Sequence, residues 1–466
     1  MHSRTARRVT RAATVLGAGL SAFLGACSDQ QRLPTSVAAG AASGDRAPNK
    51  VQCAPDNAHL TLPPGFCAVV VADLTENGAP AQARHLAVTP AGDLFVAINA
   101  PDNRQPAFGI IGLRDRDGDG VADEQSTFSP GLGGSGLAYK EGVLYFGAND
   151  RVLRYQVSAG RLSPERPAEV VVSGLPNTGD HISKDIALGD GNRLFVNIGS
   201  ASNSCQVQNR VLESPGVFPC PELPIRAGLW LFDAGGTNQS ETNGVHYGMG
   251  YRNLVSITVN PRNGDPYAVQ QGRDMLHDNW PQFFTAEQQA VLPAEEMVQI
   301  ARGSDNGWPY CYFDAVFEHK KVLAPEYGGD GHIVRGTQGI DCSTFNQPLA
   351  SFGAHTSPES MLFYTGDQFP ARYRGGAFIA FHGGFNRAPL PNEGFDVEFV
   401  PFAGGGSPSG SAEVFADGFA ESTGPLPATA KHRPVGLAQG PDGSLYISDD
   451  RGGRIYRIVF QGGNDR

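Results

Sequence analysis

The chain has 466 residues, with 36 Lys and Arg against 47 Asp and Glu, which gives a formal net charge of −11. This balance argues against nucleic acid as a partner, because phosphate binding needs a basic surface. The 60 glycines and 34 prolines fall short of the fraction typical of disordered chains, and no apolar run is as long as a membrane-spanning helix. The composition is that of a globular protein rich in turns.

The first 26 residues have the pattern of a bacterial lipoprotein signal peptide. A short apolar core, Ala12 to Phe23, follows a basic head formed by Arg4, Arg7, Arg8 and Arg11. Leu24-Gly25-Ala26 then leads directly to Cys27. We therefore expect cleavage before Cys27, lipidation of this cysteine, and anchoring to a membrane that faces the periplasm. An ordinary signal peptide that happens to contain a cysteine is the alternative.

Residues 27–52 are rich in small and polar residues without apolar periodicity, which predicts a flexible tether before a folded domain over 53–466. Six cysteines remain in the domain, an even number that favours disulfides in an exported chain. Six cysteines allow fifteen connectivities. The simplest expectation pairs near neighbours: Cys53–Cys67, Cys205–Cys220 and Cys311–Cys342. A metal site is the weaker interpretation, since no CxxC or His-rich spacing accompanies them.

One short theme recurs along the domain: an apolar strand, a tight turn with glycine, and a second strand rich in aromatic and β-branched residues. Its six copies have turn glycines at 92, 142, 191, 264, 376 and 443. Repeated antiparallel units that cannot bury their faces singly are stabilised by radial stacking. The sequence therefore predicts an all-β, six-bladed β-propeller, with a sandwich or two-domain β protein as the alternative.

The widest spacing between turn glycines separates Gly264 from Gly376, so the longest loops are expected there. The stretch Ala286 to Ile300 is dense in helix formers and predicts one short helix within this region.

The stretch DRDGDGVADE resembles a calcium-binding loop. Gly120 stands at its sharp turn, and carboxylates occupy the first, third, fifth and ninth ligand positions: Asp115, Asp117, Asp119 and Asp123. Ser126 stands where the terminal bidentate Glu would be. We expect a structural calcium site here, with a solvated acidic hairpin tip as the alternative.

Five strings occur in a characteristic order along the chain: GDH (179–181), GYRN (250–253), NGWPY (306–310), AFHGGFNR (380–387) and HRPVGLAQGPDGSLYISDDRGGRIYRI (432–458). Together they resemble the glucose/sorbosone dehydrogenase family, and the resemblance extends from about Leu60 to Ile458. It implies a periplasmic six-bladed propeller that oxidises sugars with pyrroloquinoline quinone (PQQ).

The resemblance implies a role for each matched residue. His181 occupies the position of the general base, and Asp180 that of a group hydrogen-bonded to the sugar. An imidazole suits the first role, because oxidation of an alcohol removes a proton from oxygen as hydride leaves carbon. Arg252 and Asn253 match groups that stabilise negative charge on the reduced quinone. The cofactor's carboxylates would be bound by guanidinium groups, and the candidates are Arg433 and Arg387.

Two departures distinguish this chain from the glucose-oxidising branch of the family. His382 stands where that branch has a lysine, and Val435 where it has a second arginine. The sorbosone-like branch, with a histidine in FHG, is more similar. We therefore place His382 among the cofactor-binding residues and expect a substrate other than glucose. His355, in AHTSP, aligns with a family histidine near the channel, although an ordinary loop histidine is an equal alternative.

The family also uses calcium to hold the quinone, with main-chain oxygens from the loop after the fourth repeat. The corresponding loop here begins at Gln271 and offers the carbonyls of Gly272 and Arg273 and the carboxylate of Asp274. These hard oxygen ligands suit calcium. A plain surface turn is the alternative.

The sequence thus predicts oxidation of a sugar, or of a sugar-derived aldehyde or alcohol, with PQQ and calcium as cofactors. Electrons would pass to an external acceptor, because the chain has no CxxCH motif for a haem of its own. Two alternatives stay open. One is a calcium-dependent hydrolase of the lactonase type, and the other is a binding propeller without a cofactor.

Overall fold

The structure of the protein is a computed structural model that describes residues 51–76, 78–99, 108–404 and 406–462. Contacts within the chain divide it into two units, Met1–Pro48 and Asn49–Arg466, and every described residue belongs to the second. The expected signal peptide, Cys27 and nearly all of the tether lie outside the described residues. Among the helices of the described ranges, none has the length and apolar character needed to cross a membrane.

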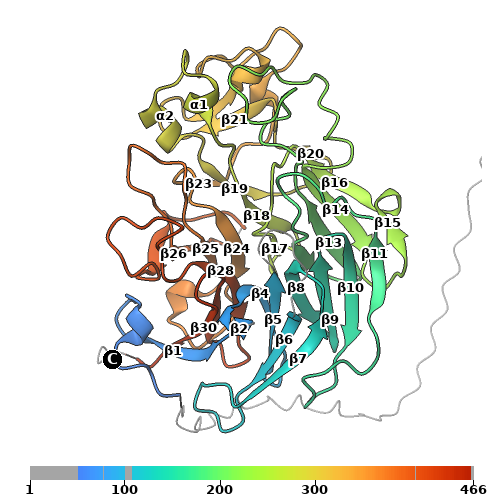
Figure 1. The fold of residues 1–466 in the computed structure, drawn as a ribbon, viewed down its shortest axis with the longest axis vertical. Coiled ribbons are helices and arrows are strands. Elements are labelled where there is room, and N and C mark those ends of the chain that lie inside the picture. The colour runs from blue at the N-terminus through green and yellow to red at the C-terminus, as the bar shows by residue number, and fades with distance from the viewer. Residues whose placement is uncertain (1–50, 77, 100–107, 405, 463–466) are drawn as a thin grey trace, which may run out of the picture. The chain divides into compact units, whose positions relative to one another are not determined.

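The described residues form six sheets of four or five strands (Figure 1). The first contains β4 (Gln82–Val88), β5 (Leu94–Asn99), β6 (Phe108–Arg114) and β7 (Glu124–Pro130). The second contains β8 (Gly134–Lys140), β9 (Val143–Ala148), β10 (Arg151–Gln156), β11 (Glu169–Ser173) and β15 (Gln239–Ser240). The third contains β12 (Ile186–Leu188), β13 (Arg193–Ile198), β14 (Gly228–Asp233), β16 (Val245–Met249) and β20 (Ser304–Asp305).

The fourth sheet contains β17 (Thr258–Val259), β18 (Pro266–Gln270), β19 (Glu295–Gln299) and β23 (Ala350–Phe352). The fifth contains β24 (Pro358–Phe363), β25 (Ala377–Phe381), β26 (Asp396–Val400) and β27 (Glu413–Ala416). The sixth contains β28 (Pro434–Gln439), β29 (Leu445–Asp449), β30 (Arg454–Phe460) and β1 (Phe66–Asp73). Two short hairpins lie outside these sheets: β2 (Thr75–Glu76) with β3 (Ala79–Pro80), and β21 (Cys311–Asp314) with β22 (Lys320–Leu323).

The sheets close into a ring. Their first strands contact one another in the cyclic order β4, β8, β12, β17, β24, β28 and back to β4. The last sheet joins both ends of the domain, because β1 pairs antiparallel with β30 from Phe66 opposite Phe460 to Asp73 opposite Arg454. The predicted all-β, six-bladed propeller is confirmed.

The six sequence repeats are the first hairpins of the six blades. Gly92, Gly142, Gly191, Gly264 and Gly443 occupy the turns between the first two strands and have positive φ, a conformation that a side chain disfavours. In the fifth blade the left-handed residue is Gly375, one position before the expected glycine. Side chains of these hairpins form the apolar clusters between adjacent blades.

The helix predicted over Ala286 to Ile300 is wrong in its second half. Helix α2 covers only Ala286–Val291 and begins with a capping box between Thr285 and Gln288. Pro293 cannot continue the helical hydrogen bonding, and Glu295–Gln299 instead form β19, which pairs with β18. Sheet pairing in the fourth blade overrides the local helix propensity.

The three expected disulfides, Cys53–Cys67, Cys205–Cys220 and Cys311–Cys342, are those of the structure. The third lies in the long insertion of the fourth blade, which also carries α1 (Leu276–Asn279), α2 and the β21–β22 hairpin, at the top of Figure 1. The insertion has an apolar core of its own, which includes Trp280, Tyr312 and both cysteines. This core and the disulfide make the insertion a rigid extension of the blade.

The acidic hairpin tip between β6 and β7 brings together three of its four expected calcium ligands. One carboxylate oxygen each of Asp115, Asp117 and Asp123 lies within 4.8 Å of the others. Asp119 instead accepts a hydrogen bond from the backbone N–H of Val121. The hairpin joins β6 and β7, the two outer strands of the first blade, and therefore lies at the outer edge of the propeller. The structural calcium site at this edge stays a prediction.

The strand topology brings the candidate site residues to one end of the ring. In every blade the first strand begins where the antiparallel second strand ends, so loops that enter first strands and loops that leave second strands share a face. His181, Arg252, His355 and Arg433 all come shortly before first strands, whereas 271–274, 383–387 and Asp450 follow second strands. Side chains from four blades, the third to the sixth, therefore reach the same end of the channel.

Candidate active site

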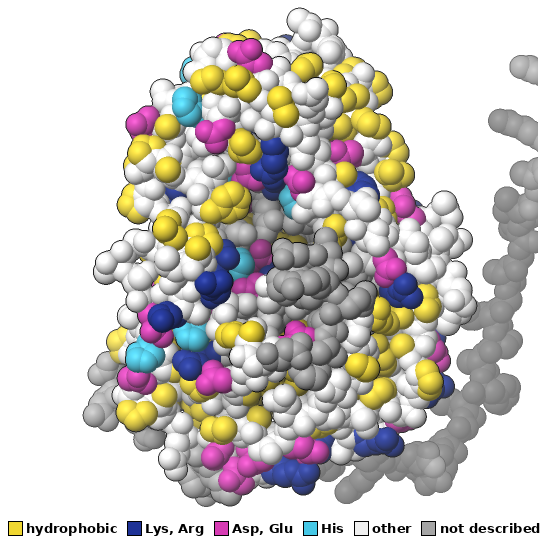
Figure 2. All heavy atoms as spheres, viewed as in Figure 1, with side chains coloured by type: hydrophobic (Ala, Val, Ile, Leu, Met, Phe, Trp, Pro, Cys, Tyr) yellow, Lys and Arg dark blue, Asp and Glu magenta, His cyan; other side chains and the backbone are white. Residues whose placement is uncertain are grey.

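A pocket of about 290 Å³ lies at this end of the ring, and the described residues that line it come from the third, fourth and fifth blades and the loops that lead into them. The lining is Asp180, His181, Arg210, Arg252, Gln271, Gly272, Asp274, Glu295, His355, Ser357 and Phe385. In space-filling form, basic, acidic and histidine side chains surround a hollow near the centre of this face (Figure 2). Six residues with a possible role assigned from the sequence are among the lining: Asp180, His181, Arg252, Gly272, Asp274 and His355.

His181 is held in one tautomer. Its Nδ1 lies 3.0 Å from the carbonyl oxygen of Ser200 and 2.9 Å from the Ser200 hydroxyl. That hydroxyl donates its own hydrogen to the carbonyl of Ser202, so both partners of Nδ1 are acceptors. Nδ1 must therefore carry the proton, and the second ring nitrogen, Nε2, keeps its lone pair. Within the described part of the chain nothing hydrogen-bonds Nε2.

The pKa of His181 is lowered to about 3, first by burial and then by the positive charge of Arg252. The imidazole is consequently neutral throughout the physiological range. A neutral ring with an unprotonated Nε2 is the form that accepts a proton.

The tautomer argument gives a testable role to Ser200, which is fully buried. In Ser200→Ala only the backbone carbonyl holds Nδ1–H, so we expect turnover to fall about fivefold to tenfold, in line with other losses of a group that orients a reactive side chain. Ring ¹⁵N chemical shifts of His181 should show a second tautomer. Ser256→Ala, which removes another fully buried hydroxyl bonded to the carbonyl of Val269, is the control and should change neither property.

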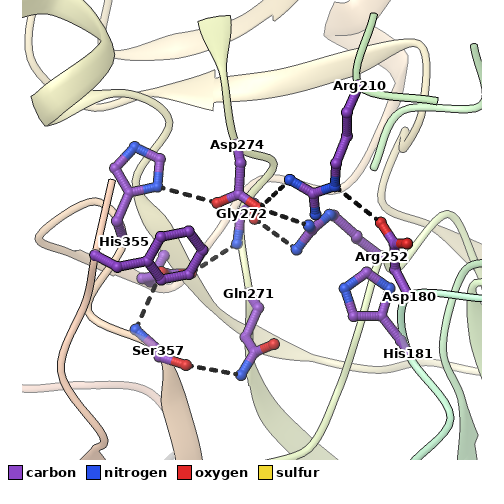
Figure 3. Close-up of a pocket in the computed structure, with 11 residues that line it drawn as sticks. Asp180, His181, Arg210, Arg252, Gln271, Gly272, Asp274, His355 and Ser357 are labelled. Carbon is purple, nitrogen blue, oxygen red and sulfur yellow. Dashed lines mark hydrogen bonds and ion pairs between the residues drawn. The ribbon is translucent and has the colours of Figure 1, made fainter. Parts of the chain in front are cut away.

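Arg252 is 4% exposed and its guanidinium is fully engaged (Figure 3). Nε and Nη2 donate to the carbonyl and side-chain oxygens of Asn203, and Nη1 donates to the carbonyl of Gly272 at 2.8 Å. Nη2 also lies 3.1 Å from the Asp274 carboxylate. The cation is thus fixed in position before any ligand arrives.

Asp274 is the anionic centre of the pocket. Besides Arg252 it contacts Arg210 Nη1 at 3.1 Å and His355 Nδ1 at 3.4 Å. Burial alone would raise the pKa of Asp274, but these positive groups, led by Arg252, hold it far below its usual range. The carboxylate is therefore ionised and already saturated with cationic partners.

His355 is a cation in this arrangement. Its Nε2 lies 2.8 Å from the carbonyl of Gln289 and 3.1 Å from that of Leu292, so this nitrogen carries a proton, while Nδ1 faces Asp274. Burial would lower the pKa of His355, but the hydrogen bond and charge of Asp274 outweigh burial and raise it. His355 thus adds positive charge behind the pocket wall.

Glu295 is the pocket carboxyl without a cation in contact with it among the described residues. It is 2% exposed, and its Oε2 accepts the N–H of Gly272 at 2.7 Å. Burial raises its pKa to about 7. At a pKa of about 7 Glu295 is half protonated near neutral pH. In the protonated form the two aspartates of the lining are opposed by Arg210, Arg252 and His355, and the pocket then carries one net positive charge inside a protein of net charge −11.

The raised pKa of Glu295 predicts a pH-dependent stability. The pKa of Glu295 is about 7 in the folded protein and 4.5 in its ordinary state, so the protonated carboxyl stabilises the folded state. This stabilisation is complete below pH 4.5 and is lost as the pH rises to 7. The free energy of unfolding of Glu295→Gln, relative to the wild type, should therefore rise by about 3 kcal/mol between pH 4 and pH 8. Urea titrations of the cofactor-free protein with a calcium chelator measure this difference, and a difference that is flat with pH would contradict it.

The remaining residues named from the sequence lie outside the pocket lining. Asn253 donates to Gln271 Oε1 and thereby orients Gln271, which does line the pocket. Arg273 directs its side chain away, to a buried ion pair with Glu326. Arg387 uses its nitrogens on Pro391 and Glu393 of its own loop and on the carbonyl of Ala354, which precedes β24.

His382 and Arg433 form a second cluster. His382 Nε2 lies 2.6 Å from Asp450, and Arg433 donates to the carbonyls of His382 and Gly383. The cluster connects to the pocket through Glu359, which accepts from Gln271 at 3.1 Å and pairs with Arg84 at 2.5 Å, while Arg84 also pairs with Asp450.

Sequence reasoning missed Arg210, Glu295, Ser357 and Phe385 as pocket residues. Arg210 lies in the loop closed by the Cys205–Cys220 disulfide. The close spacing of these two cysteines is the sequence feature that could have indicated a constrained loop at the site. Glu295 was assigned to a helix. Nothing in the local sequence distinguishes Ser357 or Phe385.

Comparison with known proteins assigns the chain to a family. A curated relative, a pyrroloquinoline quinone-dependent sugar dehydrogenase of Hypocrea jecorina, is 25% identical over 322 residues, which are 63% of this chain and 66% of that protein. Another, an uncharacterised protein of Borreliella burgdorferi, is 27% identical over 214 residues, 46% of this chain and 48% of that one. The chain thus spans between half and two thirds of the length of these relatives.

Solved structures share the fold. The calcium structure of a Trichoderma reesei carbohydrate-active enzyme of family AA12 is 20% identical with a TM-score of 0.67, over 89% of this chain and 99% of that one. The holo form of the PQQ domain of a Coprinopsis cinerea pyranose dehydrogenase is also 20% identical with a TM-score of 0.67, over 86% and 97%. The TrAA12-like family model matches residues 61–461, which is most of the chain. The chain therefore belongs to the TrAA12-like family.

Proposed function

We propose that this protein oxidises a sugar, or a sugar-derived aldehyde or alcohol, with PQQ, and that His181 is the general base. One observation carries the proposal: a neutral imidazole with an unprotonated Nε2 and a fixed guanidinium line the same pocket. The curated relative that is named a PQQ-dependent sugar dehydrogenase supports the assignment.

The residues fit an anionic cofactor. PQQ carries carboxylates, and a positive pocket inside an acidic protein favours such a ligand. Arg210 and Arg252 line this pocket, and Arg433 Nη1 has no hydrogen-bond partner among the described residues, so these three side chains would hold the cofactor. His382 and Arg387 already have carboxylate partners and contribute to position rather than to direct recognition.

A calcium ion in this pocket would be bound by Glu295 and not by Asp274, the carboxylate expected from the sequence. The Gly272 carbonyl and the Asp274 carboxylate both accept from Arg252, and Asp274 has two further cationic partners. Glu295 accepts hydrogen bonds from the backbone N–H groups of Gly272 and Ser357 and forms no ion pair with the described residues. Its carboxylate is therefore available to a metal cation. We propose that Glu295 would be the side-chain ligand of a calcium ion in this pocket.

The chain's own residues define the reaction. A bound quinone would supply the acceptor for the hydride. His181 Nε2 accepts the proton of the substrate hydroxyl, while Nδ1–H stays on Ser200 and stabilises the imidazolium that forms. Arg252, fixed by Asn203 and Asp274, opposes the negative charge that develops next to it. Asp180, anchored by Arg210 at 3.1 Å, is available to accept a hydrogen bond from a sugar hydroxyl.

The test begins with the purified protein free of cofactor. PQQ and calcium are added, the bound quinone is followed by its absorption, and sugars are screened with an artificial electron acceptor. Bleaching of the quinone band by a sugar supports the proposal. A bound quinone that no sugar reduces would overturn the substrate class, and absence of binding would favour a binding propeller. Hydrolysis of a lactone without quinone would favour the hydrolase.

We further propose that the protein is exported and anchored by a lipid on Cys27, facing the periplasm, with electrons passing to a separate acceptor. The signal-like sequence of residues 1–27 and three disulfides, which persist in oxidising compartments, support this. Cys27→Ser should release the protein from the membrane fraction in cell fractionation. Membrane retention of this variant would refute the lipid anchor.

A further inference from the structure

Phe385 differs from every other residue of the candidate active site. It is 68% exposed, the highest value among the large hydrophobic side chains of the described residues. The rest of the lining is polar, apart from Gly272, and most of it is charged. A single exposed apolar side chain is common on protein surfaces, but this ring lies in the lining of a polar pocket, where it is placed to contact a ligand.

The loop that carries Phe385 is fixed on both sides. Before it, Gly383 and Gly384 donate to the carbonyls of Thr356 and Glu393, and a side chain at Gly384 would collide with the carbonyl of His355. After it, Arg387 donates to the carbonyls of Pro391 and Ala354 and pairs with Glu393. The ring is thus held out toward the pocket by a rigid loop.

A flat apolar surface in an otherwise polar pocket matches a particular ligand chemistry. A pyranose presents hydroxyl groups around its edge and C–H groups on its ring faces. Its hydroxyls find donors and acceptors in Asp180, His181 and Gln271, whereas its C–H face needs an apolar partner. Phe385 is the sole apolar side chain of this kind among the described lining residues.

We propose that Phe385 is the platform on which a pyranose substrate stacks, and that it selects cyclic over acyclic substrates. The inference rests on the proposed sugar oxidation and deepens it. Arg387, which matched a cofactor position in the sequence, acquires a different role, because it braces the loop that presents the ring. Phe385 is a positioning residue, since it would contact the substrate without taking part in proton or hydride transfer.

The test compares Phe385→Ala and Phe385→Tyr in the protein loaded with PQQ and calcium. Phe385→Ala should raise KM about tenfold for pyranoses such as D-glucose or D-xylose, with kcat within about twofold, because an aromatic contact is lost in binding. The pyranose used for this comparison is one that the sugar screen shows to be oxidised, which need not be D-glucose. KM for acyclic D-glyceraldehyde should stay within about twofold. Phe385→Tyr keeps the ring and should behave as the wild type. Phe317→Ala, at another exposed aromatic outside the pocket lining, is the matched control.

Two readouts do not depend on turnover. Saturation-transfer NMR should show transfer to the ring C–H protons of D-xylose in the wild type and its loss in Phe385→Ala. Fluorescence titration with PQQ should give the same dissociation constant for both proteins. Unchanged KM and saturation transfer in Phe385→Ala would overturn the inference, and so would a weakened PQQ affinity. If the wild type binds no quinone, the proposed function fails, while the saturation-transfer result still decides whether Phe385 contacts a pyranose.

Discussion

Replacing His181 by alanine should lower turnover by about a hundredfold or more while the affinity for PQQ stays near that of the wild type. Nε2 of His181 is an unprotonated ring nitrogen in the pocket. Its removal leaves no other neutral imidazole among the described lining residues, because His355 is held as a cation by Asp274. Steady-state kinetics with an artificial acceptor and quinone titration measure the two quantities separately.

Three controls sharpen the His181 experiment. His181→Asn keeps an N–H donor toward Ser200 without a base, so it should be as inactive as His181→Ala. Added imidazole should restore part of the activity of His181→Ala, where space has been created, and none of His181→Asn. His246→Asn, at a half-buried histidine that stacks on Trp230, should leave turnover unchanged. Normal turnover in His181→Ala would remove this residue from the mechanism.

Replacing Arg252 by glutamine should lower turnover by about 10²–10³-fold, the usual loss when one preorganised group opposite developing charge is removed. The same change should move the acid limb of the pH–rate profile to higher pH. Activity requires neutral His181, and the charge of Arg252 helps to hold the pKa of His181 near 3, so loss of this charge raises the pKa. Burial is the larger cause of the lowered pKa, so the limb should stay below pH 6.5.

Arg252→Lys separates charge from geometry. Lysine keeps the positive charge but cannot reproduce the four contacts of the guanidinium to Asn203, Gly272 and Asp274. We therefore expect an intermediate turnover with an acid limb close to that of the wild type. Profiles for both variants that match the wild type would show that Arg252 neither stabilises developing charge nor tunes His181. Near-ultraviolet circular dichroism checks that each variant is folded.

The sequence alone determined the architecture. Turn glycines and alternating strands act within ten or fifteen residues, and six such hairpins predict a ring of blades before any contact is known. The same locality explains the three disulfides, whose partners are 14, 15 and 31 residues apart. Ordered motifs also named His181 and Arg252, which the structure brings into one pocket. Local reasoning failed at Ala286 to Ile300, where pairing with β18 outweighs helix propensity.

The tertiary structure alone decided how the pocket is charged and which groups are free within it. Asp274 is contacted by three cationic side chains, Arg210, Arg252 and His355, which are far apart in the sequence. These contacts neutralise its carboxylate, whereas Glu295 accepts backbone hydrogen bonds and stays available to a metal ion. Contacts to Pro391, Ala354 and Glu393 direct Arg387 away from the pocket, while Phe385 stays exposed in the pocket lining. The physical reason is that the fold gathers loops from many blades at one end of the ring, and the pKa and orientation of each side chain depend on neighbours distant in sequence.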